Sequence, residues 1–257
     1  MIALLLACAG PSEDTLVDEL RVLSITPEVP EAAPGQQVRQ DTLVVDPFED
    51  HRLLQWTCTS LAPGSCLEAE SEDWEGLSVD EPRGSFTVSA ALASVATDEP
   101  LPLVRRWALA CEEGLCPVFD ELDAGLTEAL RRDLQAPTEL LRDLPFEGVS
   151  LAVRGMYVSS REDPATQPTL TCAGPWEVEP AGTAEFSCAV EGRLAEGAAL
   201  WGYTSAGGWV GASVPLRSAE VGYSLVAPEE AGPVQLWVIV EDGASGSAVW
   251  SGSIRVR

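Results

Sequence analysis

Two stretches, Pro34-Gly35-Gln36-Gln37-Val38 and Pro180-Ala181-Gly182-Thr183-Ala184, begin the same pattern in the two halves of the chain. Each is a turn followed by a run in which apolar and polar side chains alternate, through Val44 in the first copy and Val190 in the second. Alternation with a period of two is typical of a β-strand that buries one face. The two stretches therefore predict a fold that is repeated along the chain.

The repeat keeps its spacing beyond these first strands. Trp56 lies 12 residues after Val44, and Trp201 lies 11 residues after Val190, so that each tryptophan opens the next strand. Short strands between Gly and Pro turns, with a tryptophan on an early strand and another on a late one, fit two packed antiparallel sheets. We therefore expect an all-β protein made of two tandem immunoglobulin-like or PKD-like β-sandwich domains.

Later runs complete each copy. The apolar run 103–110 matches the run 234–240, and each is followed by acidic residues and a glycine. A last strand is predicted near 148–158 in the first copy and near 247–256 in the second. A linker around 159–164 separates the copies, so we place the first domain at 20–164 and the second at 165–257.

A segment of different composition, near 117–147, interrupts the first copy before its last strand. Its leucines recur every fourth residue, which places them on one face of a helix. We expect a short amphipathic helical insertion whose apolar face covers one edge or end of the first sandwich or, alternatively, binds a partner. The leucines of this face are Leu122, Leu126, Leu130 and Leu134.

The chain opens with an apolar run that ends at a cysteine. Its last four residues, Leu5-Leu6-Ala7-Cys8, resemble the lipobox of bacterial lipoprotein signal peptides. The resemblance implies cleavage before Cys8 and attachment of lipid, palmitate included, to its sulfur and its new amino group. Residues 1–19 would then be a signal remnant and an acidic spacer. Because the leader is short and carries no positive charge, either the true start lies upstream, which we favour, or the leader is atypical.

The beginning of the first domain carries a second resemblance. Leu20-Arg21-Val22-Leu23-Ser24-Ile25-Thr26-Pro27-Glu28, followed by Ala33-Pro34-Gly35, is similar to uncharacterised envelope lipoproteins of high-GC Gram-negative bacteria. The shared motifs mark strands and turns, so the resemblance implies no catalytic residue. Ala9, where an aspartate would signal inner-membrane retention, implies sorting to the outer membrane, facing the periplasm or the cell surface.

Seven cysteines leave an even set of six once Cys8 carries lipid. Six cysteines in an oxidising envelope predict disulfides, and zinc held by Cys111 and Cys116 is disfavoured there. An alternative to pairing by proximity joins Cys58 to Cys111 and Cys66 to Cys116. The pairs favoured by proximity are Cys58–Cys66, Cys111–Cys116 and Cys172–Cys188.

Charge and histidine content exclude several function classes. The net charge of -26, from 41 acidic and 15 basic residues, repels phosphate backbones, so no nucleic-acid partner is expected. His51 is the single histidine, and a Ser-His-Asp or Cys-His system would have to use it. We expect it to face solvent in a turn. We predict no catalytic residue and no cofactor.

A metal site is not expected either. The candidates for one are Asp46, Glu49 and Asp50, three carboxylates in the turn before His51 that could gather a hard cation such as calcium. Their spacing matches no calcium-loop template.

The eight tryptophans divide into two groups. One group occupies repeated strand positions and is predicted to be core: Trp56, Trp107, Trp201 and Trp237. The other has no counterpart in the opposite copy: Trp74, Trp176, Trp209 and Trp250. Trp209 follows two glycines at a predicted hairpin tip, so it is the best candidate for an exposed aromatic ligand contact.

These observations predict a non-enzymatic, lipid-anchored envelope protein that acts as a spacer, scaffold or protein-interaction module. Its partners would be the membrane, through the lipid, and another envelope protein or a glycan bound by loops or edge strands. An alternative is a carbohydrate-binding accessory protein of the cell surface. A hydrolase with a pair of carboxyl groups is a third hypothesis, although nothing in the sequence singles out a pair.

Overall fold

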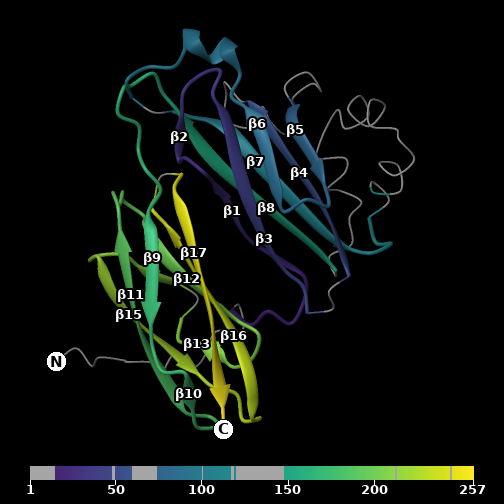
Figure 1. The fold of residues 1–257 in the computed structure, drawn as a ribbon, viewed down its shortest axis with the longest axis vertical. Coiled ribbons are helices and arrows are strands. Elements are labelled where there is room, and N and C mark those ends of the chain that lie inside the picture. The colour runs from purple at the N-terminus through teal and green to yellow at the C-terminus, as the bar shows by residue number, and fades with distance from the viewer. Residues whose placement is uncertain are drawn as a thin grey trace, which may run out of the picture. The chain divides into compact units, whose positions relative to one another are not determined.

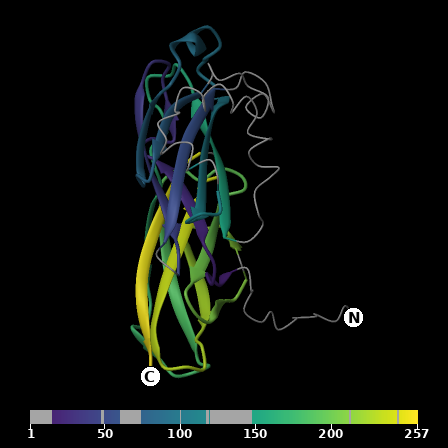
Figure 2. The same ribbon diagram turned by 90° about the vertical axis from the view of Figure 1, so that its right-hand side faces the viewer.

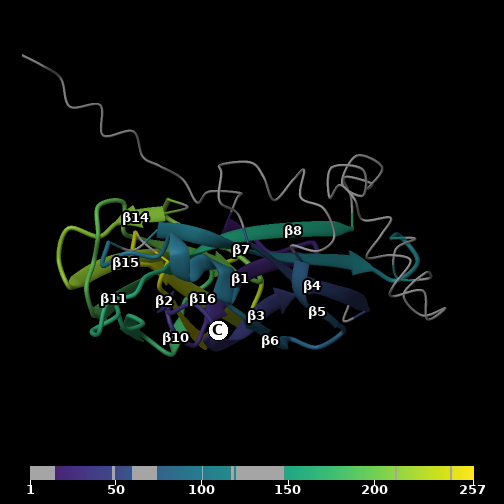
Figure 3. The same ribbon diagram turned by 90° about the horizontal axis from the view of Figure 1, so that it is seen from above.

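A computed structural model describes residues 15–47, 50–59, 74–99, 101–116, 119, 148–211, 213–243 and 245–257. The described residues form two compact units. Unit 1 holds residues 15–18, 168–243 and 248–257, and unit 2 holds residues 19–167 and 244–247. Figure 1 labels the strands of both units except β14, which is labelled in Figure 3.

Unit 2 is a sandwich of two sheets. Its three-stranded sheet has the order β1 (Arg21–Pro27), β3 (Gln37–Val45), β6 (Arg83–Thr87). Its five-stranded sheet has the order β2 (Glu31–Ala32), β8 (Val149–Val158), β7 (Leu101–Glu112), β4 (His51–Thr59), β5 (Trp74–Val79). The short β2 runs parallel to β8, and the other pairs are antiparallel. The longest pair, β7 and β8, lies side by side in Figure 3.

Unit 1 repeats this plan. Its smaller sheet has the order β13 (Gly208–Trp209), β15 (Glu220–Val226), β11 (Thr183–Glu191), β9 (Thr169–Ala173). Its larger sheet has the order β10 (Glu177–Val178), β17 (Ser247–Val256), β16 (Gly232–Glu241), β12 (Ala199–Thr204), β14 (Ser213–Pro215). The short β10 again runs parallel to the last strand, β17. The two last strands of this unit form the yellow end of the colour scale in Figure 2.

The all-β prediction of two immunoglobulin-like sandwiches is confirmed. In each unit a short early strand pairs in parallel with the last strand, and the larger sheet holds the equivalents of β4, β7 and β8. The only other described element is a short 3-10 turn, η3 (Ala90–Ser94). The helix predicted near 117–147 lies outside the described residues, apart from Phe119.

Between its two sheets, unit 2 combines apolar clusters with buried polar side chains. Gln55 is fully buried on β4 and accepts hydrogen bonds from the Gln40 amide, at 3.0 Å, and from the Thr42 hydroxyl. Arg106 on β7 is 1% exposed and donates to the main-chain oxygens of Ile25 and Gly155, at 3.1 and 2.9 Å. Burial, helped by the charge of Arg154, lowers the pKa of Arg106 to about 9. Its two carbonyl partners tie β7 to β1 and β8.

The core of unit 1 is packed around an aromatic group. The rings of Trp209 and Tyr223 stack with centroids 4.5 Å apart, and Phe186 meets Trp209 edge-on at 5.3 Å. Gly202 lies under both stacked rings, because a Cβ at this position would come within 2.7 Å of each. Burial raises the pKa of Tyr223, whose hydroxyl donates to the Gly211 carbonyl at 2.7 Å.

The repeated tryptophans do not lie between the sheets. Trp56 and Trp107 are buried, as predicted, but they stack at 5.7 Å on the outer face of the five-stranded sheet, since their neighbours Gln55 and Ala108 point inward. There they pack with Phe119.

The core prediction for the equivalent tryptophans of unit 1 is wrong. Trp201 and Trp237 are only partly buried. The cause is the alternation of side chains along each strand, which turns their neighbours Leu200 and Leu236 into the core instead.

Two glycines of unit 1 provide a matched test of its core. Replacing Gly202 by Ala should lower the free energy of unfolding of unit 1 by about 1–3 kcal/mol, because the added methyl group overpacks the rings of Trp209 and Tyr223. Gly222→Ala is the control, since a Cβ there meets nothing within 4 Å. Urea unfolding followed by tryptophan fluorescence measures both. Equal stability of the two variants would contradict this packing.

Candidate functional site

The described chain begins with a segment that is bound to unit 1. The Val17 amide donates to the Thr204 carbonyl at 2.8 Å, and the Thr15 hydroxyl accepts from the Trp209 amide at 3.1 Å. Leu16 forms a parallel bridge with Thr204. Residues 15–17 thereby lie beside the last residue of β12, on the larger sheet of unit 1. Cys8, the predicted lipid attachment site, lies outside the described residues.

Unit 2 contains a hollow of about 280 Å³. It opens where β6 stops pairing with β3: the last contact is the Thr42 amide donating to the Pro82 carbonyl at 2.8 Å. The next residues of β3 continue along β1 without β6 beside them. The hollow is lined by Thr42, Leu43, Val44, His51, Leu53, Asp80 and Pro82.

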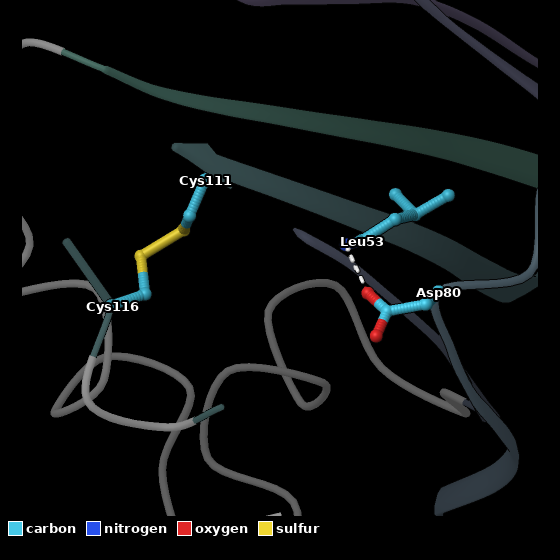
Figure 4. Close-up of a disulfide and its surroundings, with 4 residues drawn as sticks. All are labelled: Leu53, Asp80, Cys111 and Cys116. Atoms are coloured by element: carbon cyan, nitrogen blue, oxygen red, sulfur yellow. Dashed lines mark hydrogen bonds between the residues drawn. A yellow bond between two sulfur atoms is a disulfide. The ribbon is translucent and has the colours of Figure 1, made fainter. Parts of the chain in front are cut away.

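Asp80 holds one wall of this hollow. Its main chain has a φ of 56°, in the left-handed region that aspartate tolerates better than most residues. One carboxylate oxygen accepts from the Leu53 amide at 3.0 Å, the bond dashed in Figure 4, and the other accepts from the Arg52 side chain at 2.7 Å. The Asp80 amide donates in return to the Leu53 carbonyl at 2.7 Å. Asp80 thus binds the first residues of β4, where β5 no longer pairs with that strand.

The predicted acidic turn has a structural role. The Asp46 carboxylate, 1% exposed, accepts from the Asp50 amide at 2.9 Å and from His51 Nδ1 at 3.1 Å. His51 begins β4 with its side chain 29% exposed, so the expectation that it faces solvent in a turn is wrong. Glu49 lies outside the described residues. Among described residues, no group of three or more His, Cys, Asp or Glu could hold a metal ion.

The polar residues of the hollow are all engaged with their own unit. The Thr42 hydroxyl is bound to Gln55, His51 to Asp46, and the Asp80 carboxylate to Leu53 and Arg52. The remaining walls, Leu43, Val44, Leu53 and Pro82, are apolar. A hollow of this kind is suited to receive an apolar side chain of a partner more than to move protons. Sequence reasoning missed Asp80, whose partners on β4 are 27 and 28 residues away.

The cysteines of the described residues are in disulfides. Cys111 bonds to Cys116 and Cys172 bonds to Cys188, as proximity predicted, and the first of these is drawn in Figure 4. The alternative pairing of Cys58 with Cys111 is therefore wrong. Cys58 is also disulfide-bonded, and Cys66 lies outside the described residues.

The prediction of an exposed Trp209 is wrong. Its side chain is 0% exposed, and its indole N–H donates to the Tyr203 carbonyl at 2.9 Å. A bend at 205–207 precedes it, but Gly208 already belongs to β13, which pairs with β15 and turns the ring into the core. Trp176, just before β10, is 75% exposed instead. The carbohydrate hypothesis thus loses the residue on which it rested.

Comparisons with known proteins give little support for any assignment. No family model matches the chain, and the curated proteins contain no match. The D0-D1 domain of intimin is a structural neighbour at 6% sequence identity, covering 91% of this chain and 98% of its own, with a TM-score of 0.27. A likeness of that size carries no argument about fold or function. No helix among the described residues has the length and apolar character needed to cross a membrane.

Asp80 offers a direct test of how the hollow is built. Asp80→Ala should lower the free energy of unfolding by about 1–3 kcal/mol, because the Leu53 amide loses its acceptor. Asp80→Asn keeps an acceptor oxygen and a tolerated left-handed backbone, and loses only a part-exposed ion pair of roughly 1 kcal/mol or less. Urea denaturation measures the free energy of unfolding of both variants. An equal decrease in the two would mean that the acceptor for the Leu53 amide is unimportant.

Proposed function

We propose that the protein is a non-enzymatic, lipid-anchored envelope protein that presents two immunoglobulin-like domains as a scaffold or protein-interaction module. The observation that carries the proposal is the order of parts along the chain. A cysteine behind Leu5-Leu6-Ala7 is followed by two disulfide-bonded sandwiches. We place the protein at the outer membrane, facing the periplasm or the cell surface.

The disulfides support the compartment. Bonds such as Cys111–Cys116 and Cys172–Cys188 persist in oxidising surroundings and are rare in the cytosol. Each also stabilises its unit by restricting the unfolded chain, by roughly 2–4 kcal/mol. A protein kept outside the cytoplasm, without the chaperones found there, benefits from such cross-links.

The hollow of unit 2 supports a role in binding another envelope protein. Its walls are apolar, and its polar residues are already hydrogen-bonded within the unit. A partner's apolar side chain could therefore enter without the cost of desolvating a polar group that has no hydrogen-bond partner. Beside it, β3 continues past the end of β6 with no described strand on that side, and a partner's extended segment could pair with this edge. The partner contact is therefore assigned to this end of unit 2.

The lipid anchor is tested at Cys8. Labelled palmitate should enter the full-length protein expressed in a Gram-negative host and should not enter Cys8→Ser, because the lipobox sulfur is the acceptor. The variant should also leave the membrane fraction. A Cys8→Ser protein that remains in the membrane fraction without label would overturn the anchor.

The partner contact is tested by two matched substitutions, each of which replaces a leucine by arginine. Leu43 lines the hollow and belongs to none of the hydrophobic clusters, so Leu43→Arg should leave unit 2 folded and abolish capture of partners from detergent-solubilised envelope. Leu101→Arg is the control, because Leu101 is 38% exposed on the same unit and lies outside the hollow. Quantitative mass spectrometry of the captured proteins compares the two. Equal capture would place the contact elsewhere.

A further inference from the structure

We propose that unit 1, the later domain in sequence, is held with one face against the lipid surface. This face, here called the tether face, consists of residues 15–17, 204–211 and 213. The inference rests on the proposed lipid at Cys8 and adds which domain the lipid brings to the membrane. It follows from the length of the tether, the contacts that end it and the uncharged run of sequence that contributes most of the face.

The tether is short. Seven peptide steps separate Cys8 from Thr15, and a fully extended chain spans at most about 3.3–3.6 Å per residue, so these two residues are no more than roughly 25 Å apart. Residues inside the tether are mostly small or acidic, and a less extended path only brings Thr15 nearer. The first docked residue therefore lies close to the lipid headgroups.

The docking of the tether is specific to unit 1. The Val17 amide donates to Thr204 at 2.8 Å, and Thr15 is fully buried while its hydroxyl accepts from Trp209. The Val17 side chain is itself only 3% exposed. The end of the tether is thus bound to the sheet edge. The tether that limits the distance of Thr15 from the membrane therefore also limits the distance of this edge.

The body of the tether face carries no charge, although Glu13, Asp14, Asp18 and Glu19 flank its docked segment. Residues 197–216 form the longest run in the chain without Asp, Glu, Arg, Lys or His, although the whole protein carries a net charge of -26. Elsewhere, acidic surface is repelled by anionic headgroups over about one Debye length, ~8–10 Å in physiological salt. The uncharged run includes β12, β13 and β14 and contributes most of the tether face.

The tether face is suited to lie on headgroups and not to insert among acyl chains. Its large aromatic residue, Trp209, is 0% exposed, and its exposed members, Ser205 and Ser213, are small and polar. The lipid would therefore provide the membrane affinity, and the face would provide the orientation.

The absence of lysine from the chain gives a clean labelling experiment. Single lysines are introduced at Gln235→Lys and Arg217→Lys, both at exposed positions, and labelled with an amine-reactive donor dye. Gln235 adjoins the tether face through its main-chain bonds with Ser205, whereas Arg217 lies beyond the opposite end of β12. Energy transfer is measured to an acceptor lipid in vesicles of phosphatidylethanolamine and phosphatidylglycerol.

Transfer from position 235 should exceed transfer from position 217 severalfold, because β12 alone separates them by about 3.3 Å per residue over 6 residues. Equal or reversed transfer overturns the orientation. If neither label shows transfer because the protein stays in solution, the lipid anchor fails instead. The Cys8 thiol is then coupled to a maleimide lipid, and the same comparison decides the orientation separately.

A second pair of variants separates docking from mere proximity. Val17→Asp places a charge at a buried position and should release the tether from Thr204, which should reduce the difference between the two labels. Asp18→Asn changes the neighbouring exposed residue and should preserve the difference. Circular dichroism establishes that both variants are folded. A difference unchanged by Val17→Asp contradicts the role of the docked segment.

Discussion

The pairing of β4 with β7, and of β12 with β16, is the constraint on which both units depend. These central strands of the larger sheets decide, one residue at a time, which side chains enter the core and which face outward. In unit 2 the inward set includes Leu53, Gln55 and Ala108, and in unit 1 it includes Leu200 and Val238. A slip of one residue in either pair would exchange the two faces of the sheet. Gln55 accepts a hydrogen bond from Gln40 and Arg106 donates one to Ile25, and these two bonds to the opposite sheet hold unit 2 against such a slip.

Both units carry tryptophans on the outward face of these central strands, yet the two faces differ. In unit 2 Trp56 and Trp107 are directly opposite each other and stack, and Phe119 packs with them. In unit 1 Trp201 is opposite Ile239, and Trp237 is opposite Tyr203, so the two indoles are diagonal to each other. The repeat therefore preserves residue type and strand while changing the register of the pair.

The sequence allowed the strands and their repetition to be predicted because alternation and turn chemistry are local properties. The turn before Val38 is followed by β3, and the run ending at Val190 lies within β11, as expected. What failed depended on contacts between distant residues. The two glycines before Trp209 indicated a change of direction, which the structure has at 205–207, but only the pairing of β13 with β15 buries the ring. For Trp201, the strand was predicted correctly. Both faces of this strand carry apolar side chains, so the local pattern did not indicate which face is buried. Asp80 became a wall of the hollow through partners on another strand.

The docking of residues 15–17 has a consequence for the order of folding. The hydrogen bond between Thr15 and Trp209 joins residues 194 positions apart, so the first part of the described chain must wait for one of the last to be made. Contacts of such long range form slowly because the intervening loop must close first. The N-terminal segment therefore cannot pair until β12 and β13 have been made, and completion of this sheet edge requires the chain at least as far as Trp209.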